Sequence, residues 1–173
     1  MKHSTAPHIL SLPEPMARAL AEAQAAGLRG EVPVGAAVVD GQGNIIAAAG
    51  NNHHRLYDPT AHAEILALRE AAHYLGCTRL DGCDLYVSLE PCAMCAGAIS
   101  LARIRRLYYG AEDIKGGAVD NGPRFFEQTT CQHAPDVYGG IGAQEAAHLL
   151  RNFFAGLRDK SGVSRPDSPW QPQ

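Results

Sequence analysis

Apolar residues along the chain follow two spacings, that of a helix and that of a strand. Over residues 61–75 they recur three or four positions apart and Gly76 follows as a stop signal, which predicts a helix. Further helices are expected over residues 16–26, 93–102 and 144–157. Short apolar runs predict strands at 34–39, 44–49, 85–89 and 104–109. Helices and strands therefore alternate along most of the chain.

The order of these elements indicates an α/β fold. The first two strands are separated by the turn sequence DGQG from residue 40, which predicts a hairpin. The strands and helices that follow alternate, which is typical of a layered fold with a partly parallel sheet. No repeat or linker divides the chain. We therefore expect one domain over residues 16–158, between disordered segments at 1–15 and 159–173.

The composition of the chain indicates where the protein is located more than what it does. Of the 173 residues, 46% are apolar and 19% charged, and no apolar run approaches the roughly 20 residues that cross a bilayer. The first fifteen residues lack the apolar core of a signal peptide. A cytoplasmic protein without a membrane segment is expected. The net charge of −3 does not predict a nucleic-acid partner, because such proteins usually carry a basic face.

Candidate chemistry is concentrated in two short motifs, HAE from residue 62 and PCAMC from residue 91. They supply His62, Cys92 and Cys95, and zinc with three protein ligands keeps a fourth position for water. Glu64 lies two residues from the first ligand, where a carboxylate can carry the protons of that water. The combination HxE and PCxxC is the signature of zinc-dependent base deaminases.

A site of this kind replaces an exocyclic amine by a carbonyl. Bound zinc lowers the pKa of its water towards about 7, so hydroxide is available to add to an amidine-like carbon. Glu64 would accept the proton, deliver it to a ring nitrogen and help to protonate the departing ammonia. Backbone N–H groups at the start of the helix that carries Cys92 would stabilise developing charge.

The helix starts are expected to bring the ligands together. Pro91 suits the first position of a helix, and Cys92 and Cys95 then share one face of its first turn. The positive end of the helix dipole favours their thiolate forms. The sequence DPT from residue 58 is typical of a helix cap and would place His62 in the first turn of its own helix.

Two other interpretations of these residues remain. A structural zinc needs a fourth protein ligand, which would have to be Cys77, Cys83, Cys131 or another histidine, and none of these has a matching spacing. Glu64 could also merely continue the polar face of its helix. The odd number of cysteines does not suggest a disulfide framework. The other histidines are expected at the surface or in loops.

Four sequence blocks resemble the bacterial tRNA-specific adenosine deaminases, a family within the cytidine-deaminase superfamily. They are EVPVGA from residue 31, DPTAHAEI from 58, EPCAMCAGAI from 90 and YGA from 109. The similarity extends over residues 16–158. It implies a cytidine-deaminase-like fold of three layers, α/β/α, around a central mixed sheet of about five strands. It also implies one Zn²⁺ per subunit, a homodimer with the active site near the interface, and conversion of the wobble adenosine in a tRNA anticodon loop to inosine.

The resemblance assigns a role to individual residues. It implies zinc binding by His62, Cys92 and Cys95 and proton transfer by Glu64. Asn51 occupies the position that hydrogen-bonds the target adenine, although an asparagine beside Asn52 is also a common turn residue. Asp113 and Lys115 lie in the loop that contacts the anticodon stem-loop. Phe153 and Phe154 match a pair of phenylalanines, of which Phe154 is expected to stack near the RNA.

Departures from the family pattern affect the RNA contacts and leave the zinc ligands unchanged. After Gly117 the family commonly has Gly-Ser and Asn-His, where this chain has DNGP from residue 120 and QH from residue 132. The tail after Phe154 is less basic than is usual. Two further functions therefore stay open. One is a small-molecule deaminase acting on guanine, cytosine or a free nucleoside, which the acidic net charge favours. The other is a non-catalytic RNA-binding subunit with structural zinc, which an intact Glu64 disfavours.

Overall fold

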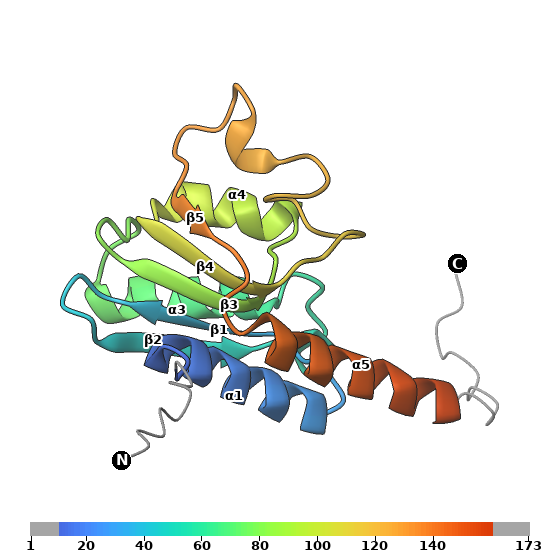
Figure 1. Ribbon diagram of the computed structural model, residues 1–173. Helices are drawn as coiled ribbons and strands as arrows, with labels where there is room; N and C mark the ends of the chain where they lie inside the picture. Colours follow the sequence, from blue (N-terminus) through green and yellow to red (C-terminus); the bar gives the residue numbers. More distant parts are fainter. Residues whose placement is uncertain (1–10, 161–173) are drawn as a thin grey trace, which may run out of the picture.

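The computed structural model describes residues 11–160, with side chains through residue 158. Within this range five strands form one sheet in the order β2-β1-β3-β4-β5 (Figure 1). The strands are β1 (Gly35–Val39), β2 (Ile45–Gly50), β3 (Asp84–Leu89), β4 (Arg106–Ala111) and β5 (Asp136–Tyr138). The helices are α1 (Glu14–Leu28), α2 (His53–Leu56), α3 (Ala63–Leu75), α4 (Ala93–Ala102), the 3-10 helix η1 (Phe125–Glu127) and α5 (Ala143–Lys160).

The sheet is mixed, as expected. β1 pairs antiparallel with β2 in a hairpin and with β3 on its other side. β3, β4 and β5 are parallel to one another. Because β3 and β4 are parallel, α4 crosses between them, and the residues that follow the carboxyl ends of both strands meet at one edge of the sheet.

Helices cover both faces of the sheet, which gives the expected three layers (Figure 1). α1 and α5 lie on one face, where Met16 and Ala19 pack against Ala37. α3 and α4 lie on the other, where Ala67 and Ile99 join the core formed with the strands. β1 is buried throughout because its alternate side chains enter the two cores. The predicted α/β class and the central five-stranded sheet are thus confirmed.

Several element boundaries differ from the predictions. The strand expected at 104–109 begins two residues later, because Ile104 and Arg105 complete the turn after α4; the Ile104 N–H bonds the Ile99 carbonyl. β5 was not predicted: it is three residues long and lacks an apolar run, and Tyr138 is held by stacking on Tyr108. α2 and η1 were also missed, since four and three residues are too short to show a helical period.

Regular structure extends beyond the predicted domain limits at both ends. α1 begins at Glu14 and α5 continues to Lys160, so the outermost residues of the domain are helical where disorder was expected for 14–15 and 159–160. Of the rest of the two segments predicted to be disordered, residues 11–13 have no regular secondary structure, and residues 1–10 and 161–173 lie outside the described residues. Among residues 11–160, no helix is both long and apolar enough to span a bilayer.

Candidate active site

Three side chains from two helix starts converge at one end of the sheet. His62 precedes α3 as its N-terminal cap residue, and Cys92 does the same for α4, whereas Cys95 lies in the first turn of α4. His62 was expected within the first turn; instead Asp58 accepts hydrogen bonds from Thr60, and the helix begins one residue after His62. The His62 Nδ1 atom lies 3.7 Å from the Cys92 sulfur and 3.5 Å from the Cys95 sulfur.

These three atoms have the spacing and the chemistry of a zinc site. Tetrahedral zinc, with bonds of about 2.3 Å to sulfur and about 2.0 Å to nitrogen, holds adjacent S and N ligands about 3.5 Å apart. One ligand atom from each of His62, Cys92 and Cys95 lies within 4.8 Å of the other two. Cys77 and Cys131, considered as a fourth ligand, bond instead to the carbonyls of Arg79 and His133. The site therefore supplies three ligands, as an open zinc site does.

The local environment favours a thiolate at Cys92. The largest influence on the pKa of Cys92 is a hydrogen bond from Cys95, which lowers it. Burial of the thiol opposes this, but a second hydrogen bond, to His62, helps to lower the pKa to about 4. The hydrogen bond that Cys95 donates to Cys92 raises the pKa of the Cys95 thiol, and burial of the thiol raises it further. Cys92 caps the positively polarised start of α4, which stabilises the anion further.

Glu64 is buried beside the three ligand atoms. It lies in the first turn of α3 and is only 3% exposed, and its Oε2 atom has no hydrogen-bond partner among the described residues. Burial raises the pKa of its carboxyl to about 7, although its own backbone N–H and the charge of His62 oppose the increase. A carboxyl that titrates near neutral pH can both accept and donate a proton.

A small cavity of about 190 Å³ opens onto these groups. Its lining residues come from the ends of several elements: Val32, Val34, Asn51, His53, His62, Glu64, Leu89, Glu90, Cys92 and Asp113. Asn51 and Asp113, both singled out in the sequence, thus lie at the cavity. Lys115 and Phe154 are not among its lining residues; Lys115 is exposed on the loop after β4, and Phe154 is exposed on α5 with its ring against Phe153.

Asn51 joins the end of β2 to the start of α3. Its Oδ1 accepts a hydrogen bond from the Ala63 N–H at 2.9 Å, and its Nδ2 donates to the Val32 carbonyl at 3.1 Å. The amide therefore caps the helix that carries Glu64. By its valence the amide keeps one further N–H and one further acceptor position, and the residue lines the cavity.

His53 lines the cavity and Glu31 contacts His53, and sequence reasoning assigned a role to neither. Glu31 is buried, and its carboxylate accepts hydrogen bonds from the backbone N–H groups of His54 and Arg55. Its second oxygen lies 3.0 Å from His53 Nδ1. The His53 ring, expected at the surface, lies edge-on to His62 with centroids 5.2 Å apart. The sequence signal that could have indicated Glu31 is that a charged residue begins the otherwise apolar EVPVGA block.

Comparison with known proteins agrees with this geometry. Residues 12–111 match the family model described as the cytidine and deoxycytidylate deaminase zinc-binding region, a range that contains the three candidate ligands and Glu64. The chain therefore belongs to this family of deaminases, and its enzymatic class is that of a hydrolytic deaminase.

Curated relatives narrow the position within the family. The chain is 60% identical to a tRNA-specific adenosine deaminase of Agrobacterium fabrum over 139 residues, which cover 80% of this chain and 91% of that protein. It is 41% identical to a tRNA-specific adenosine deaminase of Bacillus subtilis, with 87% and 92% covered. These identities assign the chain to the tRNA-specific adenosine deaminases.

Solved structures have the same fold. One, from a study of A-to-I editing by tRNA:A34 deaminases at the wobble position, has a TM-score of 0.77 and 60% identity, covering 79% of this chain and 98% of that one. A guanine deaminase from Nitrosomonas europaea has a TM-score of 0.70 and 30% identity, covering 87% and 89%. The fold thus also occurs with a free-base deaminase.

Proposed function

We propose that this protein deaminates the wobble adenosine of a tRNA anticodon loop to inosine, with one Zn²⁺ in each subunit. The observation that carries the reaction type is the buried Glu64 carboxyl, unpartnered at Oε2 and adjacent to three converging ligand atoms. The named relatives support the tRNA substrate. A tRNA substrate in turn favours a cytoplasmic location.

The site residues divide the chemistry between metal binding and proton transfer. His62 Nδ1 and the sulfurs of Cys92 and Cys95 would hold the ion, which when bound supplies a water-derived nucleophile near neutral pH. Glu64 would take a proton on Oε2 and give it to N1 of the adenine ring. With the water oxygen bonded to C6, the second proton, that of the new hydroxyl group, would pass through Glu64 to the exocyclic nitrogen. The C6–N bond then breaks, ammonia leaves, and the oxygen from water becomes the carbonyl of inosine.

Residues around the cavity would recognise the RNA. The free N–H of Asn51 suits a purine ring nitrogen, and single-stranded loop bases are the accessible targets in RNA. Asp113, at the cavity, would contact the same nucleotide. Lys115 and Phe154 lie outside the cavity and would contact the stem-loop backbone and a neighbouring base.

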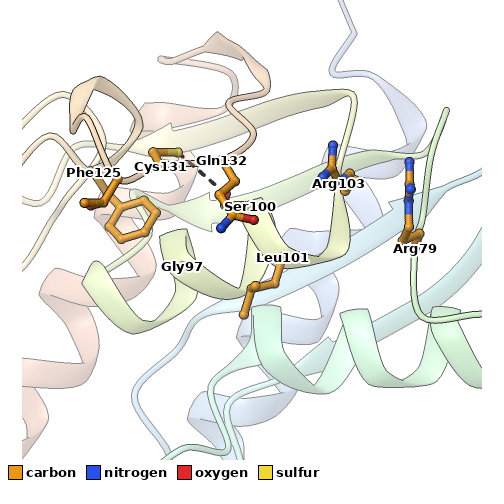
Figure 2. Close-up of a pocket in the computed structure, with 9 residues that line it drawn as sticks. Arg79, Gly97, Ser100, Leu101, Arg103, Phe125, Cys131 and Gln132 are labelled. Atoms are coloured by element: carbon orange, nitrogen blue, oxygen red, sulfur yellow. Dashed lines mark hydrogen bonds between the residues drawn. The ribbon is translucent and has the colours of Figure 1, made fainter.

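We also propose a homodimer through the outer face of α4. This helix, AMCAGAISLA, is apolar on every side, which is typical of a helix buried all round. Yet Leu101 is 79% exposed, and Gly97, Ser100 and Leu101 line a hollow of about 340 Å³ together with Phe125, Cys131 and Gln132 (Figure 2). A second copy would cover this face, and the small residues of α4 would allow close contact.

Replacing Leu101 by lysine tests the dimer. Leu101→Lys should shift the protein to a monomer in sedimentation equilibrium, because the charge would be buried at the interface. Leu28→Lys is the matched control, since Leu28 is 84% exposed at the end of α1, on the opposite layer. A monomeric wild type, or an unchanged oligomeric state in Leu101→Lys, would contradict the proposal.

The substrate is tested with an anticodon stem-loop RNA that carries adenosine at the wobble position. Zinc-loaded protein should form inosine, measured by nucleoside analysis, and Glu64→Ala should form none. Free guanine, cytidine and adenosine are incubated in parallel. Conversion of the stem-loop should weaken steeply as salt increases, because RNA binding releases counterions.

The second candidate is a small-molecule deaminase. The 30% identity to a guanine deaminase of the same fold and the net charge of −3 favour it. Ammonia released from a free base, with the RNA unchanged and little dependence on salt, would establish this function in place of the first.

A further inference from the structure

Glu90 is a buried carboxylate that belongs to neither the ligand set nor the proton path. It is 2% exposed and accepts five hydrogen bonds, all from one loop. Its Oε1 accepts three consecutive backbone N–H groups, those of Val119, Asp120 and Asn121, at 2.9 to 3.1 Å. Its Oε2 accepts the Asp113 N–H at 3.0 Å and the Asn121 side-chain amide at 2.7 Å. Consecutive N–H groups form a concave anion site, which the protein's own carboxylate fills here.

The loop held in this way, residues 112–121, follows β4 and is shaped around the carboxylate. The Glu90 N–H also bonds the Ala111 carbonyl where the loop begins, and the Ala118 N–H bonds the Pro91 carbonyl. At Gly117 an added Cβ would lie 2.5 Å from Glu90 Cδ and 2.5 Å from the Asp113 carbonyl oxygen, so only glycine fits. Within the loop, Asp113 Oδ1 accepts the N–H groups of Lys115 and Gly116.

This loop and the metal ligands meet at Glu90. Glu90 follows β3 and lies two residues before Cys92, and it lines the same cavity as Asp113. The carboxylate therefore connects a rigid strand end, from which the metal-binding helix starts, to the loop that forms one wall of the cavity. Lys115 is exposed on the same loop, two residues after Asp113.

We propose that Glu90 is a positioning residue for substrate binding: its carboxylate sets loop 112–121 against the cavity, and through Asp113 and Lys115 it determines how tightly the RNA is held. The inference rests on the proposed function, because it takes the stem-loop as the substrate. The proposal leaves the chemistry to Glu64 and the candidate zinc ligands, none of which lies in the loop.

Glu90→Gln removes some of the hydrogen bonds between residue 90 and the loop without changing the size of the side chain. A glutamine has one acceptor oxygen and one NH₂ group, and the NH₂ group must face either the three N–H groups or the two donors at Oε2. The first orientation loses the bonds from all three N–H groups, and the second loses at least the bond from the Asp113 N–H, since a backbone N–H cannot accept, even if the Asn121 amide rotates to present its oxygen. Asp84→Asn is the matched control, because Asp84 is the buried carboxylate at the other end of β3 and is paired with Arg105 at 2.8 Å.

Three measurements separate positioning from general stability. In Glu90→Gln, the amides of Asp113 and Val119 to Asn121 should exchange with deuterium at least tenfold faster, while bound zinc stays at the wild-type level. The KM for the stem-loop should rise about tenfold, as expected for lost bonds to a charged group, and kcat should change much less. Asp84→Asn should lower the melting temperature but leave loop exchange and KM unchanged.

Asn121→Ala provides a second variant if Glu90→Gln does not fold. It removes one donor to Oε2 and should raise KM and loop exchange in the same direction by a smaller factor. Unchanged loop exchange, or a KM that rises equally in Asp84→Asn, would overturn the proposal. If the wild type does not convert the stem-loop, the proposed function fails, whereas deuterium exchange still tests whether Glu90 holds the loop.

Discussion

At the scale of single residues, three buried glutamates differ in behaviour because their partners differ. Burial is the largest influence on each and acts to raise the pKa. Glu31 and Glu90 accept backbone N–H groups that reverse this effect, so the pKa of each carboxyl is lowered. Glu64 has few such partners, and its pKa rises to about 7. Hydrogen bonding therefore separates Glu31 and Glu90 from Glu64, the proposed proton carrier.

Replacement of Glu64 by glutamine should strongly reduce turnover without loss of the fold. General acid–base catalysis contributes about a hundredfold to ten-thousandfold, so kcat should fall by that amount. Zinc content and melting temperature should remain close to wild type, because the variant is isosteric and none of the ligands changes. Glu70→Gln, on the exposed side of the same helix, should be fully active. Near-full activity in Glu64→Gln would refute the role in proton transfer.

The stabilising effect of Glu31 should depend on pH in acid. Its pKa is lowered in the folded protein, so its contribution is complete above about pH 4.5 and is lost as the pH falls through the folded value. Glu31→Gln should therefore lower the free energy of unfolding by about 1–3 kcal/mol at pH 7 and by less at pH 3. Urea denaturation of both proteins at the two pH values measures this difference. If the two proteins differed in free energy of unfolding by the same amount at both pH values, or by more at pH 3, this pH dependence would be contradicted.

At the scale of elements, α1 lies unusually close to the sheet. The residues between them are small, with Ala19, Ala23 and Ala26 facing Gly35 and Gly50. A Cβ added at Gly35 would lie 2.0 Å from the Ala19 carbonyl oxygen and 2.4 Å from the Ala23 nitrogen. Gly35, the glycine of the EVPVGA block, therefore allows close packing of α1 on β1. Val34, immediately before Gly35, lines the cavity.

Gly35→Ala should push α1 away from the sheet. Overpacking of this kind costs about 1–3 kcal/mol, and a backbone contact cannot be relieved by a change of rotamer. Chemical denaturation should show the loss in the free energy of unfolding. Gly41→Ala in the hairpin turn is the control, because its Cβ would meet only the Gly82 carbonyl oxygen, at 3.7 Å. Equal stability of the two variants would show that α1 is not in tight contact.

At the scale of the whole molecule, the zinc ligands join parts that are distant in sequence. The N-termini of α3 and α4, which β3 separates in sequence, are brought together at His62, Cys92 and Cys95. A bound ion is therefore expected to stabilise the whole domain and not one helix. Binding at a hundredfold excess over Kd contributes about 2.7 kcal/mol.

Removal of zinc should lower the melting temperature of the whole protein in one transition. A loss of about 2.7 kcal/mol in a domain of this size corresponds to a decrease of about 5–10 °C. Calorimetry with and without a chelator measures the shift. Cys77→Ala should respond to the chelator like the wild type, whereas Cys92→Ala should already melt low and respond little. A strong response in Cys92→Ala would place the metal elsewhere.

Local patterns determined most of the elements and the ligand set. The helix at 93–102 was predicted at its observed limits, because its small and apolar residues lie between Pro91 and a strand. His62, Glu64, Cys92 and Cys95 were found because metal-ligand spacing and helix starts are short-range features. Asp113 and Asn51 were found only through family resemblance, since neither has a local signal that distinguishes it from a turn residue.

By itself the sequence determined the α/β class and singled out the three candidate ligands and the carboxylate beside them, since each depends on residues a few positions apart. The tertiary structure decided which of the buried carboxylates is left with an unpartnered oxygen and is therefore proposed to carry protons. Glu31, Glu64 and Glu90 have the same side chain, and only the fold determines that backbone N–H groups surround two of them and leave Oε2 of the third unpartnered. It also brought His53 to the cavity and stacked the three-residue strand β5 beside β4. Such outcomes depend on contacts between distant segments, and no local pattern encodes them.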